Sequence, residues 1–300
     1  MVPRQDKAQG PHPLPPRLAE QAKTDEGLRA FKLFCTPSRS SRRADNHDEL
    51  VERARFHLRA TEVRAVATRL GRVQTYTFTP NSPPVATALL VHGWTGEAAF
   101  MGAFGDFLRR RGMRAILMDM PAHGESEGQE ASLFDCAAAV LDVAEAVGPV
   151  QFGLGHSVGA MALLAAGEGH YPLPRAYPFE AYVLVSMPNA FADITRDFAA
   201  EHGLGPGSRR NFEQRLEQLA GRSISQFTGN SLLRTVARPS LLLHARDDAE
   251  VPFDCALAMA ETTPGVTLKA FDNLGHRAIL YAPPAVKEAS AFLMGRTAAL

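Results

Sequence analysis

The residues 150–159, VQFGLGHSVG, contain a serine in the pattern Gly-X-Ser-X-Gly. An apolar run precedes the pattern and an Ala- and Leu-rich segment follows it, so we expect Ser157 on a sharp turn between a strand and a helix. Such a turn exposes the serine oxygen, and Gly155 and Gly159 avoid a collision across it. The first N–H groups of the helix then face developing negative charge. This spacing indicates a nucleophilic serine.

The same glycines also fit a loose dinucleotide-binding loop. Gly153, Gly155 and Gly159 form the pattern Gly-X-Gly-X-X-X-Gly. The dinucleotide fingerprint belongs at an early strand–helix turn, with an acidic residue about 20 positions further on. Here the segment lies halfway along the chain and position 173 is a leucine. We therefore favour the nucleophile, and we expect no cofactor.

A nucleophilic serine needs a base near neutral pH, and an imidazole held by a buried carboxylate is suited to that task. His276 follows the β-rich run 267–271, and Asp247 and Asp248 follow the apolar run 240–243. Both positions therefore come soon after expected strands. We expect His276 to be the base and one of the two adjacent aspartates to be its partner.

Another apolar run ends in the sequence His-Gly-Trp, whose loop could present a backbone N–H. We expect the N–H groups of Trp94 and Val158 to form an oxyanion hole for an acyl tetrahedral intermediate. Trp94 and His156 are also predicted to contact the substrate. For His92 we favour a structural role, in which the ring bonds neighbouring backbone and holds the loop.

Composition and charge exclude several classes of protein. The chain has 300 residues, with 32 Lys and Arg against 32 Asp and Glu, so it has no long-range attraction for nucleic acid or an anionic membrane. No apolar run approaches the length of a membrane span, and the first residues lack a signal-peptide core. The three cysteines and ten histidines are dispersed. We therefore expect a cytoplasmic protein with reduced thiols and no metal site.

The organisation of the chain is that of an α/β protein. After about residue 60, short apolar runs alternate with helical patterns, which predicts a mostly parallel sheet with helices on both faces. Residues 1–26 are rich in proline and polar side chains and are predicted to be a disordered tail. Residues 27–60 are predicted to be an N-terminal helical extension. Residues 189–236 break the alternation and predict a small helical cap inserted between strands.

The motifs together resemble the α/β-hydrolase fold superfamily, in its serine esterase-like branch, over residues 61–300. The matching segments, in the family's order, are the His-Gly loop at 92–93, the Asp-X-Pro-X-His-Gly-X-Ser turn at 119–126, the elbow at 153–159, the Asp-X-X-Val-Pro segment at 248–252 and the Gly-His pair at 275–276. In that family the acid stands three residues before the Val-Pro pair, which implies Asp248 rather than Asp247. The resemblance implies a catalytic triad of Ser157, Asp248 and His276.

This resemblance implies a serine hydrolase of the carboxylic ester type, acting on small acyl esters through an acyl-enzyme on Ser157. The same triad also serves the hydrolysis of thioesters, lactones, amides and carbon–carbon bonds, and a small-ligand binding or signalling module on this fold is a further alternative. The neutral net charge and the apolar side chains of the insert 189–236 favour an uncharged or weakly charged acyl substrate. We expect a small-molecule substrate, no nucleic-acid partner and no membrane span, while the sequence leaves the oligomeric state open.

Overall fold

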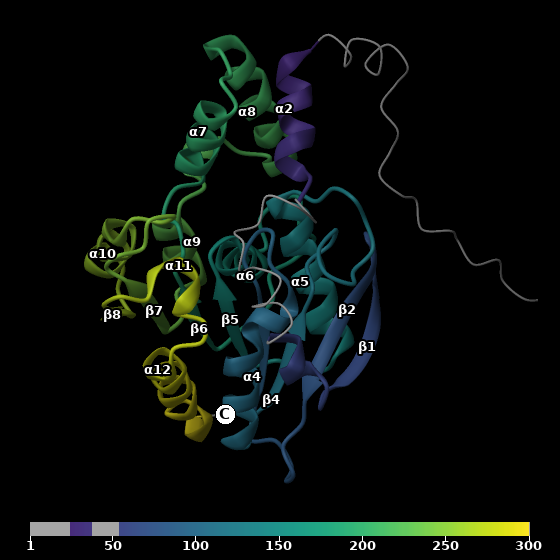
Figure 1. Ribbon diagram of the computed structural model, residues 1–300, viewed down its shortest axis with the longest axis vertical. Helices are drawn as coiled ribbons and strands as arrows, with labels where there is room; N and C mark the ends of the chain where they lie inside the picture. The colour runs from purple at the N-terminus through teal and green to yellow at the C-terminus, as the bar shows by residue number, and fades with distance from the viewer. Residues whose placement is uncertain (1–24, 38–53, 300) are drawn as a thin grey trace, which may run out of the picture.

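The computed structural model describes residues 25–37 and 54–299, which form a sheet covered by helices and a further group of helices at one end (Figure 1). The tail predicted at 1–26 lies almost wholly outside the described residues. Of the extension predicted at 27–60, the structure describes the two ends, and both are helical.

Within the described chain, eight strands form one sheet in the order β1-β2-β4-β3-β5-β6-β7-β8. Strand β2 pairs antiparallel with β1 and with β4, and every other neighbouring pair is parallel. The strands are β1 (Glu62–Thr68), β2 (Gly71–Phe78), β3 (Thr87–Val91), β4 (Arg114–Met118), β5 (Phe152–His156), β6 (Ala181–Val185), β7 (Ser240–Ala245) and β8 (Val266–Phe271). The prediction of an α/β fold with a mostly parallel sheet is confirmed.

Burial along each strand follows its place in the sheet. Every residue of β3, β5, β6 and β7 is buried, because helices cover both faces of the sheet there. This explains why these strands are continuous apolar runs rather than alternating ones. The edge strand β1 is mostly exposed and buries Val66 alone.

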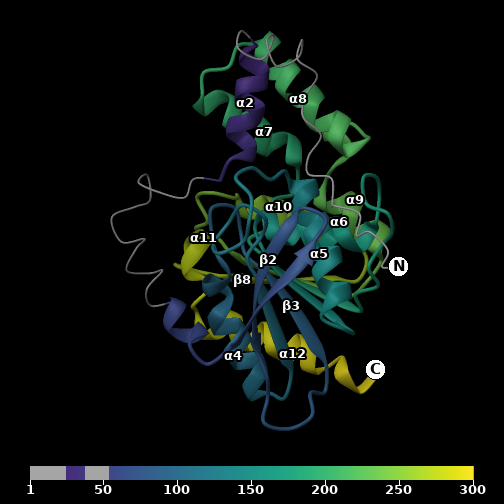
Figure 2. The same cartoon turned by 90° about the vertical axis from the view of Figure 1, so that its right-hand side faces the viewer.

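Two helical layers enclose the sheet (Figure 2). One apolar core lies beneath α5, α6, α9 and α10, and the other lies beneath α4 and α12. These helices are α4 (Gly102–Arg110), α5 (Leu133–Ala146), α6 (Val158–Glu168), α9 (Gly229–Val236), α10 (Phe253–Thr262) and α12 (Pro283–Met294). The layers leave the loops at the strand ends free to carry functional side chains.

The insert 189–236 contains α7 (Phe191–Glu201), α8 (Pro206–Ala220), the short 3-10 helix η2 (Ile224–Gln226) and α9. Helix α9 packs against α6 and belongs to the layer over the sheet, whereas α7 and α8 project beyond it. Helix α2 (Glu26–Cys35) packs against α8, and both views show it beside α7 and α8 (Figures 1 and 2). We call α2, α7 and α8 the cap helices.

The start of α6 lies directly against the backbone at the end of β3. A Cβ atom added at Gly159 would lie 2.1 Å from the carbonyl oxygen of His92 and 2.7 Å from that of Val91. Only glycine permits so close an approach. The contact brings the turn before α6 next to the loop after β3.

We expect Gly159→Ala to lower the free energy of unfolding by about 1–3 kcal/mol or more, because the new methyl group overlaps buried carbonyl oxygens that cannot move freely. Gly207→Ala is the control, since a Cβ atom there meets nothing within 4 Å and alanine favours the helix by up to about 1 kcal/mol. Chemical denaturation of both purified variants gives the comparison. Equal stabilities would contradict the close contact between α6 and β3.

Candidate active site

Ser157 occupies the turn between β5 and α6 in a backbone conformation that side-chain-bearing residues rarely adopt. Its φ is 51° and its ψ is −124°, and such a residue costs on the order of 1–3 kcal/mol unless its surroundings hold it. The Ser157 N–H donates to the carbonyl oxygen of Val185 on β6 at 2.8 Å. The turn leaves Ser157 partly exposed beyond the end of the strand, while His156 before it is buried.

Asp248 and His276 come together from the loops after β7 and β8. His276 Nδ1 lies 2.9 Å from Asp248 Oδ2, and the Asp248 side chain is fully shielded from solvent. The other carboxylate oxygen accepts the backbone N–H groups of Glu250 at 3.0 Å and Val251 at 2.8 Å. These two bonds from its own loop fix the orientation of the carboxylate independently of the imidazole.

The charge of this pair is set by competing effects. Burial alone would raise the pKa of Asp248, but the hydrogen bond from His276, the charge of that ring and the N–H of Val251 outweigh it and lower the pKa to about 2. His244 helps to hold the loop of Asp248. Its Nε2–H donates to the Val251 carbonyl at 2.9 Å, and Nε2 lies 3.4 Å from Asp248 Oδ2. At neutral pH the carboxylate is ionised, so it must accept the Nδ1–H of His276, which leaves Nε2 free for proton transfer.

The carboxylate of the adjacent residue, Asp247, has a different structural role. Asp247 is exposed, and its oxygens accept the backbone N–H groups of Leu274 at 3.2 Å and Gly275 at 3.1 Å. These contacts hold the loop that leads into His276. Of the two aspartates that the sequence offered, the structure places Asp248 against the imidazole and Asp247 against the backbone.

His156 connects the serine turn to the histidine loop. Its Nε2–H donates to the carbonyl oxygen of His276 at 3.0 Å, and the two rings lie 4.7 Å apart. The ring is buried, and burial together with the nearby His276 lowers the pKa of His156 to about 3. It is therefore a neutral donor at physiological pH. A Cβ atom at Gly93 would lie 2.6 Å from His156 Nδ1, so the ring also abuts the loop after β3.

His92 holds the loop that carries Trp94. Its Nδ1–H donates to the Gly93 carbonyl at 2.7 Å, and its Nε2 accepts the N–H of Met120 at 3.0 Å. One donor and one acceptor define a neutral ring, and burial lowers the pKa of His92 well below its usual value. The prediction that this ring bonds neighbouring backbone and holds the loop is confirmed.

His123, in the turn after β4, is a support that the sequence reasoning did not assign. Its Nε2 accepts the N–H of Thr95 at 3.2 Å, and its Nδ1–H donates to the Pro121 carbonyl at 2.9 Å. Its ring also meets the Trp94 indole edge-to-face, with 4.8 Å between centroids. The turn motif that contains His123 was the available signal, but only the fold shows which loop the ring touches.

Ser186, at the end of β6, was also missed. It is fully buried, has a φ of 48°, and contributes to the lowered pKa of Asp248. A single serine after an apolar strand gives no distinguishing signal in a sequence. Its position places a hydroxyl next to the acid of the site.

A separate cavity of about 260 Å³ lies beside the turn after β4, and none of the three expected triad residues lines it. Asp119 lines this cavity and accepts the N–H groups of Ala98 at 2.6 Å and Glu125 at 3.0 Å. Burial raises the pKa of Asp119 to about 6, against the effect of those hydrogen bonds. Arg55 and Glu97 form a two-point ion pair there, at 2.6 and 2.8 Å. Asp119, Arg55 and Glu97 are thus bonded to one another or to the backbone in pairs that need no ligand.

Two members of the expected triad, Asp248 and His276, contact each other directly. Ser157 is connected to them only through the residue before it, His156. Asp248 bonds His276, and His276 is bonded in turn by His156, the residue before Ser157. Among the described residues, Ser157 Oγ has no hydrogen-bond partner, and His276 Nε2 lies 3.9 Å from Glu250 Oε2. Nucleophile–base hydrogen bonds often form fully only when a substrate is present.

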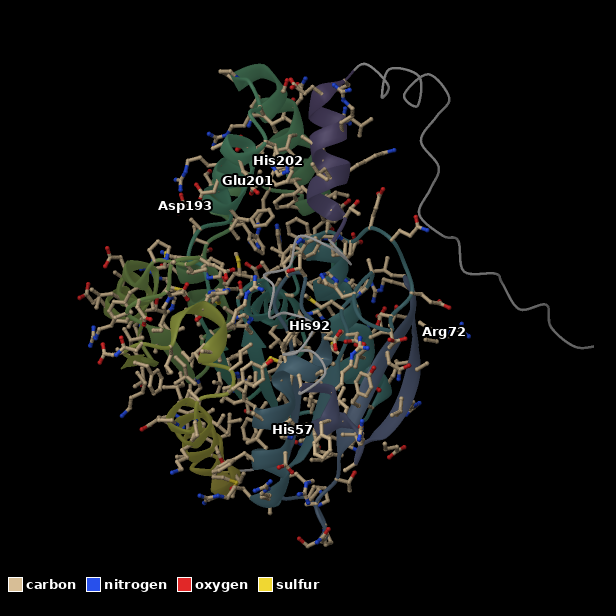
Figure 3. All side chains as sticks on the ribbon, viewed as in Figure 1. His57, Arg72, His92, Asp193, Glu201 and His202 are labelled. Atoms are coloured by element: carbon tan, nitrogen blue, oxygen red, sulfur yellow. The ribbon has the colours of Figure 1, made fainter. Side chains whose placement is uncertain are left out.

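In the part of the chain that the structure describes, no group of three or more His, Cys, Asp or Glu side chains is arranged to hold a metal ion. Figure 3 shows His92 within the body of the molecule, whereas Asp193 and Glu201 lie on α7 and His202 directly follows that helix. None of the helices within residues 25–37 and 54–299 is both long and apolar enough to cross a membrane.

Comparison with known proteins places the chain in a family. The model of the Alpha/beta hydrolase family matches residues 88–289, well over half of the chain. The chain belongs to the Alpha/beta hydrolase family. The matched region includes the loop of Trp94, the turn of Ser157 and the loops of Asp248 and His276, and the match supports a hydrolase. A search of curated proteins found no match.

Solved structures show the same fold at low sequence identity. Est1E from Butyrivibrio proteoclasticus, in a structure with ferulic acid bound, is 16% identical, with a TM-score of 0.62 over 78% of this chain and 99% of that one. A serine hydrolase from the polyaromatic hydrocarbon-degrading bacterium Cycloclasticus zankles is 17% identical, with a TM-score of 0.58 over 79% and 99% of the two chains. A thermophilic esterase from Thermogutta terrifontis, with malate bound, is 18% identical, with a TM-score of 0.56 over 79% and 99%.

The lowered pKa of Asp248 predicts a stability that depends on pH. Because the pKa falls from 3.8 to about 2 on folding, the ionised carboxylate stabilises the folded state by about 2 kcal/mol above pH ~4, and this contribution is lost as the pH falls toward ~2. Urea denaturation of the wild type and of Asp248→Asn at several pH values measures it. The wild type should lose about 2 kcal/mol more than the variant between pH ~5 and pH ~2, and parallel curves would contradict the assignment.

Proposed function

We propose that this chain is a serine hydrolase that cleaves small carboxylic esters through an acyl-enzyme on Ser157. The observation that carries the proposal is the 2.9 Å contact between His276 and the buried carboxylate of Asp248, because an imidazole held in this way serves as a base for serine. The strained turn that exposes Ser157 supports it. Esterases among the similar structures, one with ferulic acid bound, favour an ester over the other acyl substrates.

In the first half-reaction, Ser157 Oγ attacks the ester carbonyl while His276 Nε2 takes its proton. Asp248 keeps the Nδ1–H tautomer in place and stabilises the imidazolium that forms. The protonated ring then gives its proton to the leaving alcohol, and the acyl group stays on the serine. The bond between Asp248 and His276 contributes because it holds the ring in one orientation before substrate binds.

The N–H groups of Trp94 and Val158 would stabilise the tetrahedral oxyanion. Val158 is the first residue of α6, so its N–H is among those that lack a partner within the helix. Trp94 lies on the loop that His92 and His123 fix through hydrogen bonds. Each such donor is worth about 10²–10³ in rate when it is held in advance of the reaction.

In the second half-reaction, water attacks the acyl-enzyme and gives a proton to His276 Nε2. The ring returns that proton to Ser157 Oγ as the bond between Ser157 and the acyl group breaks and the carboxylic acid leaves. The partly exposed Trp94 side chain would contact the acyl group. For His156, contact with substrate stays a prediction. Its buried ring supports a positioning role, since it donates to the His276 backbone and so sets where the base stands relative to Ser157.

The direct test uses a fluorophosphonate, which forms a stable adduct only with an activated serine. We expect intact-protein mass spectrometry to find one adduct on the wild type and none on Ser157→Ala. Ester hydrolysis should fall to background in the same variant. Full esterase activity in Ser157→Ala would refute the proposal, whereas ligand-induced stabilisation without turnover would indicate a binding module.

The two adjacent aspartates supply a matched control for the triad. Asp248→Asn should reduce kcat by about 10⁴, because an amide does not hold the required tautomer of His276. Asp247→Asn should retain activity within about tenfold, because its contacts are with backbone N–H groups. Similar losses for the two variants would argue against Asp248 as the acid.

A third prediction concerns the positioning role of His156. His156→Leu removes the donor to the His276 carbonyl, so we expect kcat and the labelling rate of Ser157 to fall by about tenfold or more while KM stays nearly constant. His156→Gln restores an N–H donor at a similar distance from the backbone and should recover most of the loss. A rise in KM with unchanged kcat would instead place His156 in substrate binding.

A further inference from the structure

The carboxylate of Glu250 lies beside the nitrogen of His276 that the proposed reaction uses. Glu250 Oε2 is 3.9 Å from His276 Nε2, whereas Asp248 Oδ2 contacts the other ring nitrogen, Nδ1, at 2.9 Å. The imidazole therefore has a carboxylate near each of its nitrogens. The Glu250 side chain is 51% exposed, whereas that of Asp248 is fully shielded from solvent. Glu250 is thus the carboxylate that a molecule approaching the base can reach.

The backbone and the side chain of Glu250 make separate contacts. The backbone N–H donates to Asp248 Oδ1 at 3.0 Å and helps to hold the acid. The carboxylate accepts the Nε–H of Arg277 at 3.1 Å and an Nη2–H of the same side chain at 3.4 Å. A substitution at Glu250 therefore removes the carboxylate but keeps the backbone bond that orients Asp248.

Arg277 neutralises the charge of Glu250 at the edge of the site. It follows His276 on the short helix α11 (Gly275–Ala278), and its side chain is 54% exposed. An exposed ion pair of this kind stabilises a fold by only about 0–1 kcal/mol. The gain in stability is therefore too small to explain why a charged pair stands next to the candidate base.

The proposed reaction brings the leaving alcohol to the same nitrogen. His276 Nε2 takes the proton of Ser157 and gives it to the oxygen of the leaving group, so that oxygen must come within hydrogen-bond distance of Nε2. Glu250 Oε2, at 3.9 Å from Nε2, is then close to the carbon atoms that follow this oxygen. A hydrocarbon chain packed there would cover the carboxylate without bonding it, which costs free energy. A hydroxyl group there would donate to the carboxylate.

We propose that Glu250 selects the alcohol part of the ester and favours a leaving group with a hydroxyl on the second carbon from the ester oxygen. This inference rests on the proposed ester hydrolase. The substrate class is a neutral ester of a diol or other polyol, whose free hydroxyl donates to Glu250 as the alcohol departs. A cationic alcohol is not favoured, because Glu250 and Arg277 together have no net charge.

The test uses three butyrate esters that form the same acyl-enzyme: the n-propyl, the 2-hydroxyethyl and the choline ester. The first two differ only in a terminal methyl group against a hydroxyl. The readout is the ratio of kcat/KM for the 2-hydroxyethyl ester to that for the n-propyl ester. Comparing this ratio between wild type and variants cancels the intrinsic reactivity of the esters and any effect on the base that both esters share.

We expect Glu250→Ala to lower the ratio about tenfold or more, the size of effect of a lost hydrogen bond to a charged acceptor. Asp272→Ala is the matched control. Asp272 forms an exposed ion pair with Arg246, at 3.5 Å, between the same two loops after β7 and β8, and this variant should keep the wild-type ratio. Arg277→Ala leaves the Glu250 carboxylate unpaired, so it should raise kcat/KM for the choline ester relative to the n-propyl ester.

Two outcomes would overturn the inference while the hydrolase stands. If Glu250→Ala slows both neutral esters alike and keeps their ratio, the carboxylate acts only through His276 and does not meet the alcohol. If the wild type prefers the choline ester to the 2-hydroxyethyl ester and Glu250→Ala loses that preference, the selected alcohol is a cation rather than a polyol.

Fluorophosphonate labelling of Ser157 separates this inference from the function on which it rests. Labelling of Glu250→Ala shows that the serine and its base are intact in that variant, so a changed ratio then reports the alcohol alone. If the wild type is neither labelled nor able to hydrolyse any of the three esters, the proposed function fails and this inference fails with it.

Discussion

The candidate site depends on a backbone turn that is unfavourable by itself and is held by its neighbours. Ser157 adopts a positive φ, and the bond from its N–H to Val185 and the contact of Gly159 with the His92 carbonyl keep it there. The turn does three things at once. It exposes the serine side chain, directs the first N–H groups of α6 outward, and brings the loop of Trp94 alongside. A relaxed turn would lose all three together, which is why strain is tolerated here.

The buried histidines around this turn are used as neutral hydrogen-bonding groups rather than as charges. His92, His156 and His244 each donate to a backbone carbonyl, and burial lowers the pKa of all three. A neutral imidazole costs far less to bury than an ion and still offers a directional donor. His276 differs because its partner is a carboxylate. His244 lies 3.4 Å from the same carboxylate oxygen but donates to a backbone carbonyl, so the 2.9 Å bond to Asp248 distinguishes His276 as the candidate base.

The sequence predicted those features that short segments determine. The strands appear as apolar runs, and the turn at Ser157 and the loops at Asp248 and His276 follow such runs directly. The sequence could not predict which surfaces meet across long separations. The docking of α2 on α8 depends on an Asp25–Arg215 contact across 190 positions. The contact of His123 with Trp94 likewise arises only when two strand ends become neighbours, and no local pattern reports that.

The adjacent aspartates show how the chain makes a buried charge acceptable. Consecutive residues in a loop can point in different directions, so Asp247 bonds the exposed backbone before His276 while Asp248 is buried against the ring. Burying Asp248 would be costly if its oxygens lacked donors. The N–H groups of Glu250 and Val251 and the ring of His276 supply them, and the lowered pKa shows that these donors more than offset the burial. Two of the three donors belong to the acid's own loop. That loop thus fixes the orientation of the carboxylate, while the hydrogen bond and the charge of His276 contribute most to lowering its pKa against the effect of burial.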